Sequence, residues 1–520
     1  MTTHATAPAT INSTGYSIHH SANAWVAVMR AARAIRPSVG STHTAWLEAM
    51  LARNHGCAYL RRYGTPRTLA AFRAQIPLCT YEDLRDDMAQ IAAGASDVLF
   101  AGRPVAYEKT GGSSAGSKLI PYTAHGLADF QYNLLPWLAD TVQAFHITGR
   151  AYFSISPATR QAEAIAGVPV GLPDGAYLGA QAGAALPHLL AVDPEVASIS
   201  DVPRWKEATA RQLHAAHDLE LISVWSPTFL LHLLDAMPDA PACWPRLKLV
   251  SCWTHGPAQR YAQALQQRLP HVAIQAKGLL ATEGVMTIPW VQPPSQAAHA
   301  SYASHANAQH AAHAPTADSP CVPAPHGFAE FLQGDTCYLP HELEPGQTYE
   351  VVLTTSSGLY RYRTGDRVLC TGRATLPNAP AHTPCPVPTL VFMGRDSLHS
   401  DLVGEKLTEA FVAHCLRHWP GYAVLVPDAA HTCYVLVTEK SPDDPNHALA
   451  QLEQQLCANP QYAYARRMGQ LAPLRLCVQA QASAIVERSL LQRGVRLGDI
   501  KPLALRAEAW WLPLLEFPSP

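Results

Sequence analysis

The chain has 520 residues, of which 48% are hydrophobic and 15% are charged, and its formal net charge is −2. This length exceeds what one hydrophobic core usually supports, so we expect two or three domains. The balanced charge argues against a nucleic-acid-binding protein and against binding to an anionic membrane surface. The 12 cysteines form no C-x-x-C pair, and neither a signal peptide nor a membrane-spanning apolar run is visible, so we expect a soluble cytoplasmic protein with reduced thiols.

Apolar periodicity predicts helices between residues 20 and 75, and the first candidate site follows them. Residues 107–123 read YEKTGGSSAGSKLIPYT, with small and hydroxyl-bearing residues directly before Lys118. The hydroxyls of Ser113, Ser114 and Ser117 and nearby backbone N–H groups can converge on an anion, and Lys118 adds a positive charge. This combination suits ATP, although the P-loop pattern cannot be placed here. A flexible surface turn is the alternative interpretation.

Strand and helix then alternate along the chain. Strands are predicted at 151–155, 221–224, 247–251 and 272–275, with helices at 228–236 and up to residue 269. This alternation favours an α/β domain with a mainly parallel sheet. In such sheets, ligands bind at the carboxyl ends of the strands.

Two later segments carry acids at predicted strand ends. In KGLLATEG (277–284), the Glu283 carboxylate can hold Mg²⁺, which usually binds together with phosphates. The alternative is a helix start, with Thr282 as the cap. In GLYRYRTGDR (358–367), Asp366 is predicted in a Gly-Asp turn between two strands, where a carboxylate can accept both hydroxyls of a ribose. An ordinary turn residue is the alternative there.

The composition changes at residues 295–325, which are rich in Ala, His, Ser and Pro and predict a flexible loop. A metal site is the alternative, but the spacing of the candidate ligands is irregular: His299, His305, His310 and His313. From Gly394 onward the pattern restarts as a small α+β unit, with a helix predicted at 407–419. Arg395 at this boundary can contact ribose or phosphate, or pair with a neighbouring acid. Lys501, in the loop GDIKP, can reach a neighbouring cleft or remain solvated.

Taken in order, these parts resemble those of an adenylate-forming enzyme. The chain resembles the bacterial branch of the GH3 acyl-acid amido synthetases, in the superfamily that also holds acyl-CoA synthetases and firefly luciferase. The resemblance covers most of the chain and rests on these segments: FRAQIPLCTYEDLRDDMAQIAAG, TGGSSAGSKLIPYT, WSPTFLLHLLD, SCWTHGPAQRYAQAL, KGLLATEG, TTSSGLYRYRTGDRVLCTG and VGEKLTEAF. The second departs from the family's usual T-S-G-T-T form but keeps the hydroxyl and N–H donors.

The resemblance implies an α/β fold with a large N-terminal domain (1–393) of mainly parallel and mixed sheets flanked by helices, and a small mobile C-terminal α+β domain (394–520). It implies a ligase that uses ATP and Mg²⁺ to convert a carboxylic acid into an acyl-adenylate and pyrophosphate. An amine, commonly an amino acid, then gives an amide and AMP. Transfer to a CoA or carrier-protein thiol, transfer to an unusual nitrogen nucleophile, and an inactive nucleotide-binding protein are the alternatives.

The resemblance also implies residue roles. The phosphates are expected to contact Ser113, Ser114, Ser117 and Lys118, and Mg²⁺ is expected at Glu283. Thr282 is expected at the α-phosphate or the acyl carboxylate, Tyr360 at the nucleotide, Asp366 at the ribose, and His255 with Gly256 beside the adenine. Arg395 is expected to act at the hinge, and Lys501 in the first half-reaction. Trp225, Phe229 and Trp253 are expected to line the acid pocket, with core packing as the alternative. The sequence does not indicate the acid, the acceptor or the oligomeric state.

Overall fold

The computed structural model describes residues 13–35, 43–109, 118–154, 163–291, 321–375, 386–395, 399–493, 500–506 and 509–514, apart from Pro173, Ser200, Pro238 and Gly404, together with Val495 and Leu497. The phosphate-loop serines and residues 295–320 of the Ala/His-rich stretch therefore lie outside the described residues, whereas the last part of that stretch forms a strand at Cys321–Pro323. Within the described part of the chain, every helix is too short or too polar to span a membrane.

The N-terminal helices predicted between residues 20 and 75 are confirmed. They are α1 (Ser13–Ile35), α2 (His43–Asn54), α3 (Ala58–Arg62) and α4 (Leu69–Gln75), and α5 (Arg85–Ala92) follows. Helices α2 to α5 share one apolar core with residues from 328–362. A small sheet next to this core has the order β2-β1-β5-β4, from β1 (Ala106–Lys109), β2 (Leu119–Tyr122), β4 (Glu163–Ile165) and β5 (Val168–Val170).

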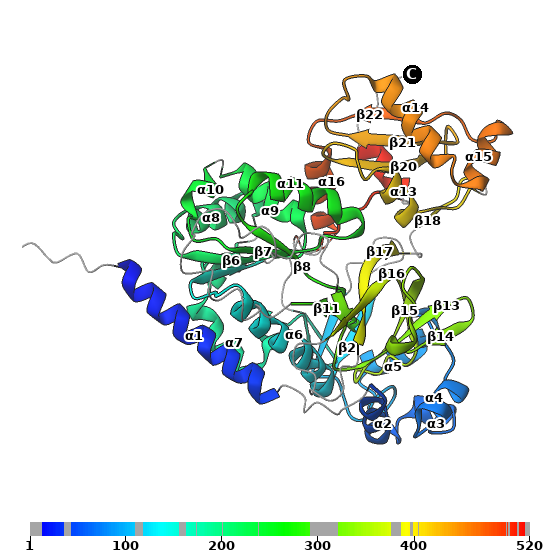
Figure 1. Ribbon diagram of the computed structural model, residues 1–520. Helices are drawn as coiled ribbons and strands as arrows, with labels where there is room; N and C mark the ends of the chain where they lie inside the picture. The colour runs from blue at the N-terminus through cyan, green and yellow to red at the C-terminus, as the bar shows by residue number, and fades with distance from the viewer. Residues whose placement is uncertain are drawn as a thin grey trace, which may run out of the picture.

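The four strands predicted between 151 and 275 are confirmed and form a parallel sheet of order β3-β6-β7-β8 (Figure 1). Their bounds are Arg150–Phe153, Leu219–Ser223, Leu249–Cys252 and Ala273–Ala276. Apolar side chains on both faces meet helices, as expected for a parallel sheet. One face packs on α1, α6 (Ala124–Ala144) and α7 (Gly179–Ala185). The other packs on α8 (Val202–His214), α9 (Pro227–Asp235) and α11 (Gln259–Arg268), with α10 (Ala240–Cys243) nearby.

A seven-stranded antiparallel sheet has the order β11-β12-β17-β16-β15-β13-β14. Its strands are β11 (Thr287–Pro289), β12 (Cys321–Pro323), β13 (Phe328–Gln333), β14 (Thr336–Tyr338), β15 (Thr348–Thr354), β16 (Tyr362–Thr375) and β17 (Pro386–Arg395). Asp366 lies inside β16, so the predicted Gly-Asp turn is wrong. Gly365 has a φ of 74°, and this left-handed residue is accommodated within a strand whose pairing is irregular.

Residues 277–285 form no helix, so the alternative in which Thr282 caps a helix is wrong. Strand β9 (Leu280–Ala281) pairs with β10 (Gly284–Val285), and Thr282 and Glu283 form the tight turn between them.

The C-terminal elements form their own three-stranded sheet, of order β20-β21-β22. They are β18 (His399–Ser400), β19 (Leu407–Thr408), α13 (Glu409–Cys415), β20 (Ala423–Asp428), β21 (Cys433–Thr438), α14 (Pro445–Leu456), α15 (Pro460–Arg467), β22 (Arg475–Val478) and α16 (Ala482–Gln492). The helix predicted at 407–419 is therefore shorter and begins after a strand. These elements lie beside β17 and α11 in Figure 1, and a hydrogen bond of 3.0 Å joins Glu487 to His232 of α9. A domain boundary at Gly394 remains our proposal.

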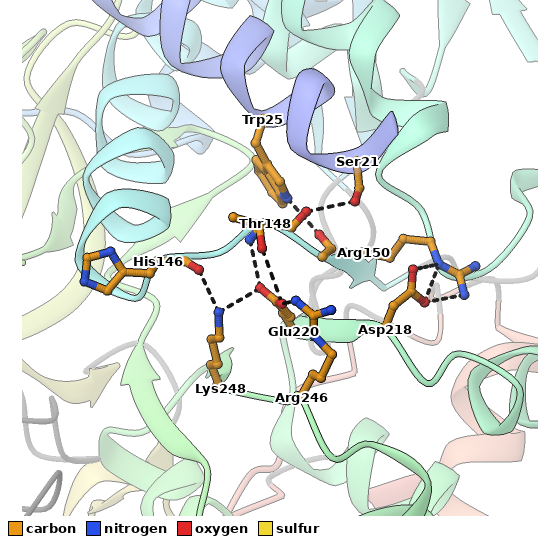
Figure 2. A network of polar contacts seen from close by, with 10 residues as sticks. Ser21, Trp25, His146, Thr148, Arg150, Asp218, Glu220, Arg246 and Lys248 are labelled. Atoms are coloured by element: carbon orange, nitrogen blue, oxygen red, sulfur yellow. Dashed lines mark hydrogen bonds and ion pairs between the residues drawn. The ribbon is translucent and has the colours of Figure 1, made fainter. Parts of the chain in front are cut away.

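A buried carboxylate joins the amino ends of three parallel strands (Figure 2). Glu220 is fully buried in β6, and it accepts hydrogen bonds from the Thr148 N–H at 2.8 Å, from Lys248 Nζ at 2.9 Å and from Arg246. Burial alone would raise its pKa, but backbone N–H donors and Lys248 lower the pKa below the ordinary value. Helix α1 attaches at the same place, since Trp25 Nε1 donates to the Gly149 carbonyl at 2.9 Å. This network orients the sheet whose opposite ends carry the candidate site.

Candidate functional site

Lys118 lies directly before β2 and points to the antiparallel sheet. Its Nζ donates a hydrogen bond of 3.1 Å to the Tyr362 hydroxyl and lies 5.4 Å from the centre of the Tyr81 ring. The lysine is half-buried. The described end of the phosphate-loop candidate therefore meets the first residue of β16, 244 positions away in the sequence. Ser113, Ser114 and Ser117 cannot be placed, because they lie outside the described residues.

Glu283 brings a negative charge to this pair. The residue is 7% exposed, and no hydrogen bond to its carboxylate is formed within the described part of the chain. Burial raises the pKa of the Tyr362 phenol above its usual value, and the charge of Glu283 raises it further. The same charge adds to the raised pKa of Arg395. Glu283 therefore lies within electrostatic range of both side chains.

Asp366 and Arg395 face each other across β16 and β17, where they are direct register partners. Arg395 Nε donates to Asp366 Oδ1 at 2.6 Å, and Nη2 donates to Oδ2 at 3.3 Å. The carboxylate is 3% exposed, and it is the main cause of the raised pKa of Arg395. Of the two interpretations of Arg395, the structure shows pairing with an acid. A ribose contact by Asp366 remains a proposal.

The tryptophans border the site at the carboxyl ends of β6 and β7. Trp225 and Trp253 have ring centres 6.2 Å apart, and the backbone N–H of Trp253 donates to the backbone carbonyl of Trp225 at 2.9 Å. Lys501, from the C-terminal elements, is exposed and has its Nζ 5.8 Å from the centre of the Trp253 ring. Thr282 accepts a 2.6 Å hydrogen bond from the Tyr122 hydroxyl at its carbonyl oxygen. The Thr282–Glu283 turn thus contacts Tyr122, which belongs to the same apolar cluster as Trp225.

His255 and Gly256 lie at the start of the short helix before α11, beside the end of β17. Gly256 has a φ of 58°, and a Cβ there would lie 3.5 Å from the Phe392 ring. The backbone thus passes close to the strand that ends at Arg395. An adenine contact at this place remains a proposal.

Two predicted site residues are not brought to this cluster. Tyr360 is fully buried in the N-terminal core, where its hydroxyl donates to the Leu99 carbonyl at 2.7 Å and its ring stacks on Tyr59 at 5.0 Å. Phe229 is 5% exposed and packs against Trp205 in the core beside the parallel sheet. For Phe229, the core-packing alternative therefore describes what the structure shows.

Tyr362 was missed by sequence reasoning, although it lies two positions beyond Tyr360. Arg361 between them has a φ of 48°, and this left-handed backbone gives the two tyrosines different surroundings. The sequence carried no signal for this change. Lys277 was missed as well, even though its charge in an apolar segment was visible.

The cluster combines the Lys118 ammonium, the Glu283 carboxylate, which accepts no hydrogen bond in the described part of the chain, and the Asp366–Arg395 ion pair. Lys118 and Arg395 can neutralise a phosphate, and a buried carboxylate such as Glu283 is a hard oxygen ligand that suits Mg²⁺. No group of three His, Cys, Asp or Glu side chains is arranged to bind a metal in the described part. A metal at Glu283 would therefore take its other ligands from water or from a bound phosphate.

Known proteins resemble this chain in sequence. The curated protein "Probable indole-3-acetic acid-amido synthetase GH3.1" of Oryza sativa subsp. japonica is 37% identical over 95 residues, and that match spans 17% of this chain and 16% of that protein. The corresponding GH3.2 protein of the same plant is 44% identical over 79 residues, which span 14% of this chain and 13% of that protein.

Solved structures resemble it over almost the whole length. The structure "GH3.15 acyl acid amido synthetase" superimposes with a TM-score of 0.74 at 18% identity and covers 93% of this chain and 94% of that one. A complex titled "AtGH3.15 acyl acid amido synthetase in complex with 2,4-DB" gives a TM-score of 0.74 at 17% identity, covering 94% and 95%. These matches confirm the predicted α/β fold.

Sequence models of the three GH3 family domains match the chain in order. The N-terminal domain matches residues 31–240, the central domain residues 322–381 and the C-terminal domain residues 406–507. Together they cover well over half of the 520 residues, and the chain therefore belongs to the GH3 family.

Proposed function

We propose that this protein is an AMP-forming ligase that activates a small carboxylic acid with ATP and transfers the acyl group to an amine, with an amino acid as the acceptor. The observation that carries the proposal is the meeting of Lys118, Glu283 and the Asp366–Arg395 pair around Tyr362. Family membership and the named amido synthetase relatives support it. The segment KGLLATEG supports placement in the bacterial branch of the GH3 family, within the adenylate-forming superfamily.

In the first step, a carboxylate oxygen of the acid attacks the α-phosphorus of ATP. A new oxygen–phosphorus bond forms, the bond to the β-phosphate oxygen breaks, and pyrophosphate leaves. Lys118 binds the phosphates and neutralises the charge that gathers on the leaving group. Mg²⁺ held by Glu283 supplies further neutralisation when it is bound. Asp366 accepts hydrogen bonds from the ribose hydroxyls, and Arg395 holds its carboxylate in place.

In the second step, the amine nitrogen attacks the acyl carbon. The carbon–oxygen bond to AMP breaks, AMP leaves, and the nitrogen loses a proton to give the amide. Lys501, whose expected role is in the first step, approaches the site from the C-terminal segment along Trp253. Movement of these elements between the steps would exclude water from the adenylate. Trp225 and Trp253 form the acid side of the pocket.

The test is acid-dependent exchange of labelled pyrophosphate into ATP, measured with a panel of carboxylic acids. We expect Lys118→Met and Glu283→Gln to lower exchange by about 100-fold or more, the usual loss when one charge-stabilising group is removed. Lys440→Met is the matched control, because Lys440 is exposed on the C-terminal elements. Absence of exchange with every acid would refute the synthetase proposal. Mass spectrometry with amino acids and with CoA then separates amide from thioester products.

A further inference from the structure

Lys277 is a buried lysine that the proposed reaction does not yet use. It directly follows β8 and is 4% exposed. Its Nζ donates a 2.5 Å hydrogen bond to Ser223 Oγ and lies 4.9 Å from the centre of the Trp225 ring and 5.8 Å from that of Trp137. Indole faces and one hydroxyl thus surround the ammonium at the carboxyl ends of β6 and β8.

The charge of Lys277 lacks a carboxylate partner within the described part of the chain. Its ionisable neighbour is Cys252, and burial raises the pKa of that thiol to about 12, so the thiol is neutral. Burial lowers the pKa of Lys277 to about 8, which leaves the ammonium mostly protonated at neutral pH. An ammonium has three N–H donors, and an isolated buried charge is costly. An anion bound beside Lys277 would offset that cost.

Packing connects Lys277 to the reaction site. Trp225 packs against the apolar cluster that contains Leu280 and Tyr122, and the Tyr122 hydroxyl donates to the Thr282 carbonyl at 2.6 Å. An extended chain covers at most about 3.6 Å per residue, so the Cα atoms of Lys277 and Thr282 are at most about 18 Å apart. This is the upper limit of the separation across which one acid would contact both ends of the segment.

We propose that the Lys277 ammonium binds a second carboxylate of the acid substrate, at the end remote from the carboxylate that is activated. The substrate class is then a dicarboxylic acid whose apolar or aromatic spacer lies against Trp225. The inference rests on the proposed function, because it specifies the acid of the first step. An acid without the second carboxylate leaves the ammonium uncompensated and is discriminated against.

The test compares matched acids by pyrophosphate exchange: heptanedioate with heptanoate, and terephthalate with 4-methylbenzoate. We expect the wild type to favour a diacid by about 10- to 100-fold in kcat/KM, the range for one charge-assisted contact. Lys277→Met keeps an unbranched apolar side chain. It should lower kcat/KM for the diacid by that factor and change it for the monoacid less than about threefold. Equal losses for both acids, or a wild type that favours the monoacids, would overturn the inference.

Two further measurements separate the possible failures. Lys277→Met should melt at or above the wild-type temperature, because an uncompensated buried charge is removed. Calorimetric binding of heptanedioate without ATP provides a readout independent of catalysis. If the wild type binds the diacid and Lys277→Met does not, the site is supported. This holds even if no acid gives exchange, because the absence of exchange refutes only the synthetase proposal. Diacid binding that is absent, or unchanged in Lys277→Met, overturns the inference.

Discussion

Replacing Glu220 by Gln should destabilise the parallel sheet. Glu220 is fully buried and accepts hydrogen bonds from the Thr148 N–H, Lys248 and Arg246. Removing one charge of a buried network typically costs about 3–5 kcal/mol. Lys248 and Arg246 are 37% and 38% exposed, so water compensates part of the loss. We therefore expect the free energy of unfolding of this sheet to fall by about 2–3 kcal/mol at pH 7.

The assay is hydrogen exchange of the β3 and β6 amides, with thermal melting as a second readout. Glu82→Gln is the control, because the Glu82–Arg85 ion pair is exposed and should change stability by less than about 0.5 kcal/mol. The pKa of Glu220 is lowered in the folded protein, so its contribution is present above the unfolded-state pKa and lost as the pH falls through the folded one. The difference from Gln should therefore shrink in acid. A Glu220→Gln effect as small as that of Glu82→Gln, or one that does not change with pH, would refute the reasoning.

Three further predictions concern other residues. Burial raises the pKa of Glu409 to about 7, so the contribution of this residue to folding stability is present below about pH 4.5 and is lost as the pH rises through 7. Glu409→Gln should therefore raise the melting temperature at pH 8 more than at pH 5. A larger gain at pH 5 would contradict this. Gly278 has a φ of 81°, and a Cβ there would lie 2.5 Å from the Thr287 carbonyl oxygen. Gly278→Ala should therefore lower the free energy of unfolding by about 1–3 kcal/mol, as measured by denaturant unfolding. An unchanged unfolding midpoint would count against this. Asp366→Asn should weaken ATP binding at least tenfold in calorimetry, and unchanged affinity would remove Asp366 from the ribose site.

The parallel sheet could be predicted because its evidence is local. Strands β6 and β7 are short apolar runs, each followed by a turn and a helix, so their existence does not depend on distant residues. The antiparallel strand β16 was harder. Its Gly365–Asp366 pair has the composition of a turn, and Gly365 does keep a left-handed φ, but Asp366 pairs with Arg395 of β17 and so lies within the strand.

The site was predicted residue by residue but not as an arrangement. The order of Lys118, Glu283 and Asp366 along the chain indicated the chemistry, whereas the Lys118–Tyr362 contact depends on a separation that periodicity cannot report. The role of Tyr360 was predicted from its motif, but stacking on Tyr59 inside the core involves residues with no local signal. The burial of Tyr360 thus depends on contacts between residues far apart in the sequence, which local sequence patterns do not predict.

The pairing of Asp366 with Arg395 places a ribose-binding candidate and the end of β17 in one rigid unit. β17 leads directly into the C-terminal elements. A shift of those elements that pulls on Arg395 would withdraw a hydrogen-bond donor from Asp366 and change its affinity for ribose. By thermodynamic reciprocity, a bound nucleotide would then bias the orientation of the C-terminal elements by the same free energy. Nucleotide binding and the position of the C-terminal elements would thus influence each other through a single ion pair.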